Sequence, residues 1–316
     1  MSNESRLSGP AALEVLAAKR PCIELRTRMI RSVRSFFEKE GFLEVQTPLL
    51  TRAPAPEPHI NPVAVADGRF LGASPELHMK RMLAAGFDKI FQVTSAFRDA
   101  ERGRLHHPEF TILEWYRLGA NYKDLQQDCQ NMLRSVSDAL GISRLLRNGV
   151  RLEAAGDWQR VTVREAFSRF AGWEPDAGFD QTRFDVDMVT KIEPNLGFPS
   201  PCILEDYPAS RAALARLKPD NPLVAERFEL YWAGMELANG FSELVDKAEQ
   251  RARFEAVRDM RQAAGLKTGP MPEAFLSSLD RLPPCAGIAF GVDRLAMLLC
   301  GADSIDSVIA FTVEDE

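Results

Sequence analysis

The residues best suited to hold phosphate groups gather in FRDAERGRLHHPEFTILEWYR (97–117). Several basic or potentially basic side chains lie close together there: Arg98, Arg102, Arg104, His106 and His107. Guanidinium groups bind phosphate and carboxylate through paired, charge-assisted hydrogen bonds. This local density of basic groups predicts an anionic ligand, although the whole chain has a formal net charge of −6. Such an acidic balance is not typical of proteins whose main task is to grip a nucleic-acid backbone.

The end of the same stretch, 110–117, is rich in β-branched and aromatic residues and predicts a strand. Alternate residues of a strand point to one face, so Phe110, Glu114 and Tyr116 are expected to lie together. Residues 89–97, KIFQVTSAF, have a similar composition. We therefore expect an antiparallel pair of strands joined by a long polar loop.

Two further stretches carry charged residues at positions that suit a binding site. GMELANGFSEL (234–244) sets Glu236 and Glu243 seven residues apart around Asn239 and Gly240. The Asn-Gly pair predicts a chain reversal between the two carboxylates. In GIAFGVDRL (287–295), Arg294 stands at the expected start of a helix, beside small residues that let a flat ligand approach the backbone.

The elements that must position these residues can be predicted from periodicity. Segment 26–40 has apolar residues at helical spacing and ends before Gly41, and it leads into an extended segment, 41–50. Strands are predicted at 227–237 and 285–291, and a helix at 293–301 with Asp293 as its N-cap. With intervening helices at 123–140 and 246–264, the pattern predicts an α+β domain around a mainly antiparallel sheet.

Bulk properties exclude several classes of protein. A chain of 316 residues with 45% apolar residues can bury a large core. We expect no membrane segment and no signal peptide, hence a cytoplasmic protein. The cysteines are odd in number and scattered, which predicts reduced thiols rather than disulfides or a zinc site: Cys22, Cys129, Cys202, Cys285 and Cys300.

Each candidate residue also has a plain interpretation. Isolated Arg and Glu side chains usually solvate a surface, Phe110 is suited to a core, and His106 and His107 are suited to a polar loop. Asp293 and Arg294 together fit an ordinary helix start. What favours a functional interpretation is that all three stretches occur in one order in one chain.

In that order, the stretches resemble the signature motifs of class II aminoacyl-tRNA synthetases. GFLEVQTP resembles motif 1, FR…HHPEFT..E.Y resembles motif 2 of the lysine subgroup, and GIAFGVDRL resembles motif 3. ELANGFSEL and ASPELHMKRML (73–83) strengthen the resemblance, which covers 25–316. It implies a catalytic domain over 25–316, an N-terminal extension over 1–24, and no OB-fold for anticodon binding.

The resemblance implies an ATP-dependent ligase that forms an aminoacyl-adenylate and needs Mg²⁺. Arg98, Arg294 and Glu236 are the implied catalytic residues, and Glu236 and Glu243 the implied metal ligands. The implied ATP-binding residues are Arg98, Asp99, Ala100, His106, His107, Phe110, Glu236, Leu237, Gly291 and Arg294. The implied amino-acid-binding residues are Ser74, Glu76, Glu114, Tyr116, Asn239, Glu243 and Ala289.

Two positions depart from the family pattern. Motif 2 usually reads FRNE, but Ala100 stands where the carboxylate is usual, and Glu101 is one residue further along. In a strand Glu101 would point to the other face, whereas a loop can compensate. His107 replaces the usual Asn. These changes are expected to weaken catalysis or to alter how ATP is held.

The resemblance is strongest to the stand-alone branch of the family, which attaches β-lysine to a lysine of translation elongation factor P. The expected substrate is (R)-β-lysine or lysine, the expected acceptor is that protein rather than tRNA, and a homodimer is expected from motif 1. Ala289 is usually Gly in the lysine synthetases and Ala in this branch. The alternatives are a lysine ligase with another acceptor and a non-catalytic, synthetase-like regulatory subunit.

Overall fold

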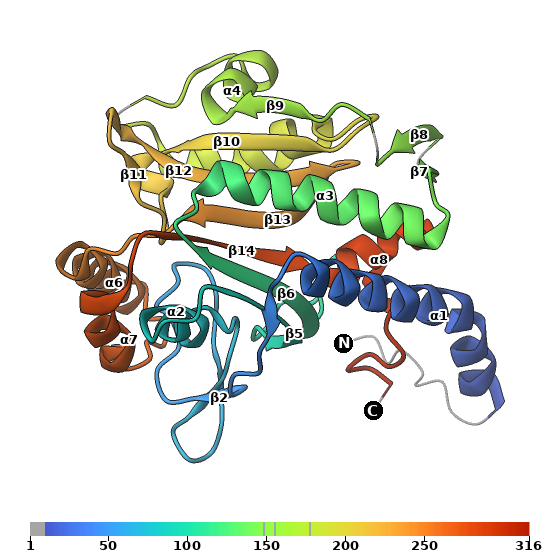
Figure 1. The fold of residues 1–316 in the computed structure, drawn as a ribbon, viewed down its shortest axis with the longest axis horizontal. Helices are drawn as coiled ribbons and strands as arrows, with labels where there is room; N and C mark the ends of the chain where they lie inside the picture. The colour runs from blue at the N-terminus through green and yellow to red at the C-terminus, as the bar shows by residue number, and fades with distance from the viewer. Residues whose placement is uncertain (1–9, 148, 155, 177, 316) are drawn as a thin grey trace.

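A twisted sheet lies at the centre of the computed structural model, which describes residues 10–147, 149–154, 156–176 and 178–315 (Figure 1). Within that part of the chain the sheet has nine strands in the order β1-β5-β6-β14-β13-β12-β10-β9, and β11 pairs with β12. The strands are β1 (Leu43–Glu44), β5 (Lys89–Phe97), β6 (Glu109–Leu118), β9 (Gln159–Thr162), β10 (Cys202–Pro208), β11 (Leu217–Lys218), β12 (Asn221–Trp232), β13 (Met235–Ser242) and β14 (Cys285–Gly291).

Most neighbouring strands of this sheet run antiparallel. The parallel pairs among the described residues are β1 with β5 and β9 with β10, at the two edges. The central strands β5, β6, β14, β13 and β12 are antiparallel throughout. The predicted α+β class with a mainly antiparallel sheet is therefore confirmed.

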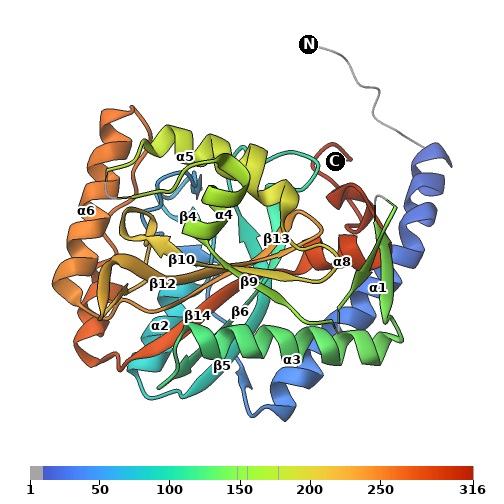
Figure 2. The same cartoon turned by 90° about the horizontal axis from the view of Figure 1, so that it is seen from above.

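One face of the sheet is covered by the helices α1 (Pro10–Lys39), α3 (Tyr122–Leu140) and α8 (Val292–Cys300) (Figure 2). Phe37 on α1 is fully buried, and its ring lies 4.9 Å from the ring of Phe91 and 5.0 Å from that of Trp115. Burial of such aromatic side chains contributes about 1.5–3 kcal/mol each. These helices therefore cover one face of the sheet. The opposite face is the one that can carry a site.

The opposite face is only partly covered. Helices α2 (Glu76–Ala84), α6 (Lys247–Ala263) and α7 (Glu273–Ser278) pack together beside the β5 and β6 end, as Figure 1 shows. Helices α4 (Val163–Ala171) and α5 (Gln181–Asp187) lie near β9 and β10. The remaining described strands form a small sheet of β2 (Leu50–Thr51), β4 (Phe70–Leu71) and β3 (Val63–Ala64), and a hairpin of β7 (Arg144–Arg147) and β8 (Val150–Glu153).

Helix α1 is much longer than the sequence predicted. The expected helix 26–40 is its C-terminal half, where Met29, Val33 and Phe37 are buried. The helix continues back to Pro10 and contains Pro21, which usually interrupts a helix because it lacks an N–H donor. In the N-terminal half Cys22 and Leu25 pack against the core, whereas Leu13 and Val15 are exposed, and this mixed burial together with Pro21 hid the start of the helix in the sequence.

The chain reversal expected at Asn239-Gly240 is wrong. The structure turns instead at Ala233 and Gly234, whose φ angles of 54° and 71° fit a tight hairpin turn between β12 and β13. Gly240 lies inside β13, where an added Cβ would come within 2.8 Å of the Phe228 ring. This glycine therefore serves close packing between neighbouring strands, not a turn.

A β-bulge at Leu237 sets the faces of β13. Leu230 pairs with Ala238 while Tyr231 pairs with Glu236, so Leu237 is an extra residue in the ladder. Residues an odd number apart normally point to opposite faces of a strand, and one extra residue reverses that rule. The bulge accordingly lets Glu236 point to the same face as Asn239 and Phe241, all three of which line one cavity.

The N-cap predicted for α8 is also wrong. The helix begins at Val292 with Gly291 as its cap, and Asp293 is the second helical residue. The Asp293 carboxylate accepts hydrogen bonds from the backbone N–H of Thr111 at 2.6 Å and from Arg26 Nε at 3.0 Å. This buried carboxylate therefore joins α8, β6 and α1, and fixes the start of the helix that carries Arg294.

No helix in the described ranges is long and apolar enough to cross a membrane.

Candidate active site

An open cavity of about 430 Å³ lies over the uncovered face of the sheet. This volume is in the range of small-molecule sites. The residues predicted for amino-acid binding that line it come from α2 and its approach, β6, β13 and β14: Ser74, Glu76, Glu114, Tyr116, Asn239 and Ala289. The face shared by Glu114 and Tyr116 on β6 is the one that points into the cavity, whereas Trp115 between them is buried in the core.

Glu114 is fully buried and held by two donors. Ser74 Oγ donates to Oε1 at 2.6 Å, and the Tyr116 hydroxyl donates to Oε2 at 2.7 Å. Burial, with Glu76 nearby, raises the pKa of Glu114 to about 8, although the two donors oppose the rise. The neutral form of this carboxyl is therefore favoured more than that of an ordinary glutamate, and a cation in the cavity would favour the charged form.

Lys80 is a member of the site that the sequence analysis did not identify. Its ammonium is fully buried, contacts Glu76 Oε1 at 2.5 Å, and forms an ion pair with Glu243 Oε2. Burial opposes the charge of Lys80, but Glu243 and Glu76 outweigh it and raise its pKa above the ordinary lysine value. The helical spacing of Glu76 and Lys80 was visible in the sequence, but their burial was not.

Gly287 and Ala289 form the wall of the cavity on β14. Gly287 pairs with Tyr116, and an added Cβ would overlap the Tyr116 ring and Glu243 Oε1. Ala289 pairs with Glu114 on one side and with Asn239 on the other. The strand therefore passes close to the groups expected to bind an ammonium, and only small residues leave that space open.

A second, narrower cavity adjoins the first and holds the residues predicted for ATP. It is lined by Arg98, His106, His107, Phe110, Glu236, Leu237, Gly291 and Arg294. The Arg98 guanidinium lies 4.9 Å from the centre of the Phe110 ring. Arg294 donates to the backbone oxygen of Glu236 at 2.7 Å, and its Nη2 lies 2.7 Å from His106 Nε2. Two guanidinium groups thus frame a space with an aromatic ring on its wall.

The two cavities share a boundary formed by Arg98, Ile112, Glu236, Asn239 and Ala289, each of which lines both. Asn239 Oδ1 accepts a hydrogen bond from Arg227 Nε at 3.1 Å, which fixes the amide. A cavity rich in carboxylates therefore meets a cavity framed by guanidinium groups at Arg98. This arrangement is suited to bringing an ammonium-bearing acid and a phosphate ester into contact.

The loop after Arg98 differs from the family pattern in a way the structure explains. Asp99 and Ala100 are exposed and line neither cavity, and Ala100 has a φ of 62°. Glu101 does line the nucleotide cavity, and its Oε2 lies 3.4 Å from Arg98 Nη1. Because β5 ends at Phe97, Glu101 follows in a loop, and its carboxylate reaches this cavity beside Arg98 although residue 100 does not.

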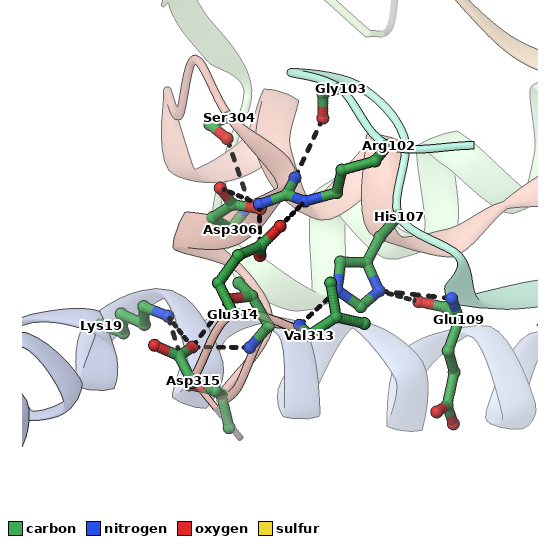
Figure 3. A network of polar contacts seen from close by, with 12 residues as sticks. Lys19, Arg102, Gly103, His107, Glu109, Ser304, Asp306, Val313, Glu314 and Asp315 are labelled. Atoms are coloured by element: carbon green, nitrogen blue, oxygen red, sulfur yellow. Dashed lines mark hydrogen bonds and ion pairs between the residues drawn. The ribbon is translucent and has the colours of Figure 1, made fainter. Parts of the chain in front are cut away.

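The nitrogens of His107 are both engaged by the protein. Nδ1 lies 2.6 Å from the Glu109 carbonyl oxygen, and Nε2 accepts from the Val313 backbone N–H at 3.2 Å (Figure 3). Both contacts are satisfied by the neutral tautomer with its proton on Nδ1. His107 therefore holds the loop 98–108, which we call the nucleotide loop, against the C-terminal segment, and neither of its ring nitrogens is left free for ATP.

The C-terminal segment 311–315 holds the nucleotide loop from the outside. Arg102 donates to both carboxylate oxygens of Glu314, at 2.8 and 2.9 Å, and to Asp306 at 3.0 Å. Figure 3 shows how these side chains face one another. Lys19 on α1 lies 4.0 Å from Asp315. Arg102 therefore binds these two carboxylates. The sequence alone did not distinguish it from the basic residues around it.

The roof of the amino-acid cavity is the loop between β2 and β3. Arg261 on α6 is buried and donates to the backbone oxygens of Glu57 and Pro58, at 3.0 and 3.1 Å, and to Asn61 Oδ1 at 2.8 Å. The Glu57 side chain lines the cavity. Burial and the nearby Glu76 raise the pKa of Glu57 to about 7. One guanidinium therefore fixes a loop that brings a titratable carboxyl to the site.

The predicted metal ligands lie in different environments. Among the described residues no group of three or more His, Cys, Asp or Glu side chains is arranged to hold a metal ion. Glu236 lines both cavities and keeps its carboxylate partly exposed, which suits a ligand of Mg²⁺ that also binds phosphate oxygens. Glu243 lines neither cavity and is paired with Lys80. The placement of Glu236 therefore fits the expected role of a metal ligand better than that of Glu243 does.

The geometry agrees with comparisons against known proteins. A family model described as tRNA synthetases class II (D, K and N) matches residues 13–315. The chain therefore belongs to the class II tRNA synthetase family.

Within that family the chain resembles a particular group of enzymes. It is 38% identical over 308 residues to an elongation factor P–(R)-β-lysine ligase of Vibrio cholerae, with 92% of this chain and 94% of the relative covered. It is 37% identical to ligases of the same name from Klebsiella pneumoniae, with 93% and 95% covered, and Salmonella gallinarum, with 94% and 97% covered.

Proposed function

We propose that this chain catalyses the ATP-dependent ligation of (R)-β-lysine, or lysine, to a lysine side chain of translation elongation factor P. The observation that carries the proposal is the shared boundary of the two cavities, where Arg98 lies between pocket carboxylates and the nucleotide space. The names of the similar enzymes support the choice of substrate and acceptor.

In the first step, a carboxylate oxygen of the amino acid attacks the α-phosphorus of ATP. The bond from that phosphorus to the bridging oxygen breaks, which releases pyrophosphate and leaves an aminoacyl-adenylate. Arg98 is placed to hold the carboxylate and the α-phosphate together, and Arg294 to bind the terminal phosphates. Phe110 offers a flat ring against which the adenine can stack. Mg²⁺, when bound at Glu236, would neutralise phosphate charge.

In the second step, the unprotonated side-chain nitrogen of the acceptor lysine attacks the adenylate carbonyl carbon. The bond to the AMP oxygen breaks, AMP leaves, and the nitrogen loses a proton as the amide forms. Glu57 lines the cavity, and its pKa of about 7 suits a carboxylate that takes up this proton at neutral pH. Its fixed loop supports that role.

The amino-acid cavity suits a substrate with two ammonium groups. Glu114 and Glu76 line it, and Glu243 lies behind the Tyr116 ring and Gly287. We assign Glu243 and Tyr116 to the distal ammonium and Glu76 and Glu114 to the other one. A buried carboxylate left without a cation is unfavourable, so neutral amino acids of similar shape are rejected.

The proposal includes a homodimer built on the motif 1 segment and a cytoplasmic setting. Leu43 on β1, Leu49 just before β2 and Phe87 just before β5 expose 53%, 41% and 39% of their surface. Large apolar side chains exposed on and beside the motif 1 segment favour burial against a second copy. Sedimentation velocity at micromolar concentration checks the dimer, and a purely monomeric species would contradict it.

The function is tested in two assays. ATP–pyrophosphate exchange with a panel of amino acids should show activity with β-lysine and lysine and little with norleucine, which lacks the distal ammonium. Mass spectrometry of elongation factor P incubated with enzyme, ATP and each isomer should show the mass of one added residue. Exchange without any mass gain on the factor, together with charging of tRNA, would overturn the acceptor; absence of exchange with every amino acid would favour a regulatory subunit.

A further inference from the structure

Three carboxylates and one ammonium are buried together at the inner end of the amino-acid cavity. Glu76 comes from α2, Glu114 from β6 and Glu243 from the end of β13, and Lys80 lies between Glu76 and Glu243. The side chains of Lys80 and Glu243 have no exposed surface, and that of Glu76 exposes 12%. In such a setting, like charges repel strongly unless an opposite charge separates them.

Lys80 has no other polar partner among the described residues. Its ammonium lies 5.4 Å from the centre of the Phe241 ring and 5.9 Å from that of Phe275, so aromatic faces complete its surroundings. A lysine in this position costs desolvation energy that a leucine or methionine would avoid. Its ammonium is therefore better explained by the carboxylates it contacts than by packing.

Glu243 is left with one free oxygen. Oε2 is paired with Lys80, whereas Oε1 is buried and accepts no hydrogen bond from any described residue. Oε1 lies beside the space above Gly287 and next to the Tyr116 ring, both of which line the cavity. A buried, unpaired carboxylate oxygen is costly, and a cationic ligand removes that cost.

We propose that Lys80 is a positioning residue for substrate recognition: its ammonium holds Glu243 so that Oε1 stays directly behind Gly287 and the Tyr116 ring in the cavity wall, where it can accept the distal ammonium of the substrate. Lys80 also neutralises the charge of one of the three carboxylates. The other two carboxylate charges are then left to bind the two ammonium groups of β-lysine or lysine. This inference rests on the proposed function, because it assumes a diammonium substrate.

The charge of Glu243 depends on Lys80. Burial raises the pKa of Glu243, and Lys80 opposes that rise, while Glu76 and Glu114 add to it. The other titratable groups near this pair are Glu57 from the loop before β3, Tyr116 from β6 and Cys285 from β14. Loss of Lys80 should therefore let Glu243 hold a proton at higher pH and lose its attraction for an ammonium.

The test compares Lys80→Met with the wild type in ATP–pyrophosphate exchange. The KM for lysine should rise at least about tenfold, the preference for lysine over norleucine should fall by a similar factor, and the acid limb of the pH profile of kcat/KM should move to higher pH. Lys123→Met is the matched control, because Lys123 also lies over an aromatic ring, that of Tyr122 at 4.7 Å, and pairs with a carboxylate, that of Glu205 at 2.5 Å, but lines neither cavity. It should change none of these values.

If Lys80→Met does not fold, as judged by its melting curve, Lys80→Gln replaces it, because an amide can still donate a hydrogen bond to a carboxylate without carrying charge. A variant that is folded but keeps the wild-type KM, selectivity and pH profile would overturn the inference. Failure of the proposed function is a different result, since the wild-type enzyme itself would then show no exchange with lysine or β-lysine.

Discussion

Replacement of Gly287 by alanine is the sharpest test of the shape of the amino-acid cavity. The added Cβ would overlap two atoms of the Tyr116 ring and Glu243 Oε1. Tyr116 exposes only 3% of its surface, and its hydroxyl donates to Glu114 at 2.7 Å. The ring therefore cannot move aside without breaking a contact of the pocket.

The expected cost follows from overpacking a rigid site, which is typically about 1–3 kcal/mol. Each loss of about 1.4 kcal/mol of transition-state stabilisation lowers kcat/KM about tenfold. When the cost falls on the substrate complex, kcat/KM for lysine or β-lysine therefore drops by a factor of about 5 to 150. The KM for ATP should stay close to the wild-type value, because Gly287 does not line the nucleotide cavity.

The assay is ATP–pyrophosphate exchange with the amino acid and ATP varied separately. Gly291→Ala on the same strand is the control for the amino-acid KM, because its Cβ would lie at ordinary contact distances, 3.5 and 3.6 Å from Arg294 atoms and 3.6 Å from the Leu237 oxygen. If Gly287→Ala binds lysine as the wild type does, the proposed position of the substrate against Tyr116 and Glu243 is wrong.

Four further outcomes are expected. Arg98→Ala and Arg294→Ala should each reduce exchange by a few hundredfold, about 3–4 kcal/mol of transition-state stabilisation, and near-normal exchange would remove that arginine from the mechanism. Ala289→Gly should shift selectivity toward α-lysine by up to about 1–3 kcal/mol, measured as a ratio of kcat/KM for the two isomers. Lysine binding at pH 7 should release a proton, because the pKa of Glu114 is raised to about 8 and a bound ammonium lowers it. The affinity for lysine should therefore rise from pH 6 to pH 8. If this reasoning is incorrect, the binding enthalpy measured by calorimetry will be the same in buffers of different ionisation enthalpy. Glu57→Gln should slow transfer to elongation factor P while adenylate formation persists, and an unchanged single-turnover transfer rate would exclude Glu57 as the proton acceptor.

The elements that carry the site could be predicted because their sequences have strong periodicity or composition. Strands 89–97 and 110–117 appear as β5 and β6, and helices 123–140 and 246–264 match α3 and α6 within a residue or two. The common face of Glu114 and Tyr116 followed from strand alternation alone. Local rules suffice where one face of an element is buried and the other lines the site.

What the sequence did not reveal depends on contacts between distant segments. The Asn-Gly pair in β13 suggested a turn, but Phe228 on the neighbouring strand requires the glycine, and the true turn uses Ala233 with a positive φ. Lys80 is fully buried beside Phe241 on β13 and Phe275 on α7, and no local pattern in the sequence shows that burial. The engagement of His107 and Arg102 by the C-terminal segment also arises only in the folded chain.

The extra residue at Leu237 has a consequence for how this enzyme can vary. Substitutions along β13 change one side chain at a time, but a one-residue insertion or deletion there would turn Glu236 away from the side that holds Asn239 and Phe241. The Glu236 carboxylate, which we propose as the Mg²⁺ ligand, would then no longer lie on the same side as the amino-acid cavity. Changes in the length of this strand should consequently be tolerated far less well than substitutions in it. In a library of single-codon deletions across 235–242, no variant that carries the deletion alone should be active.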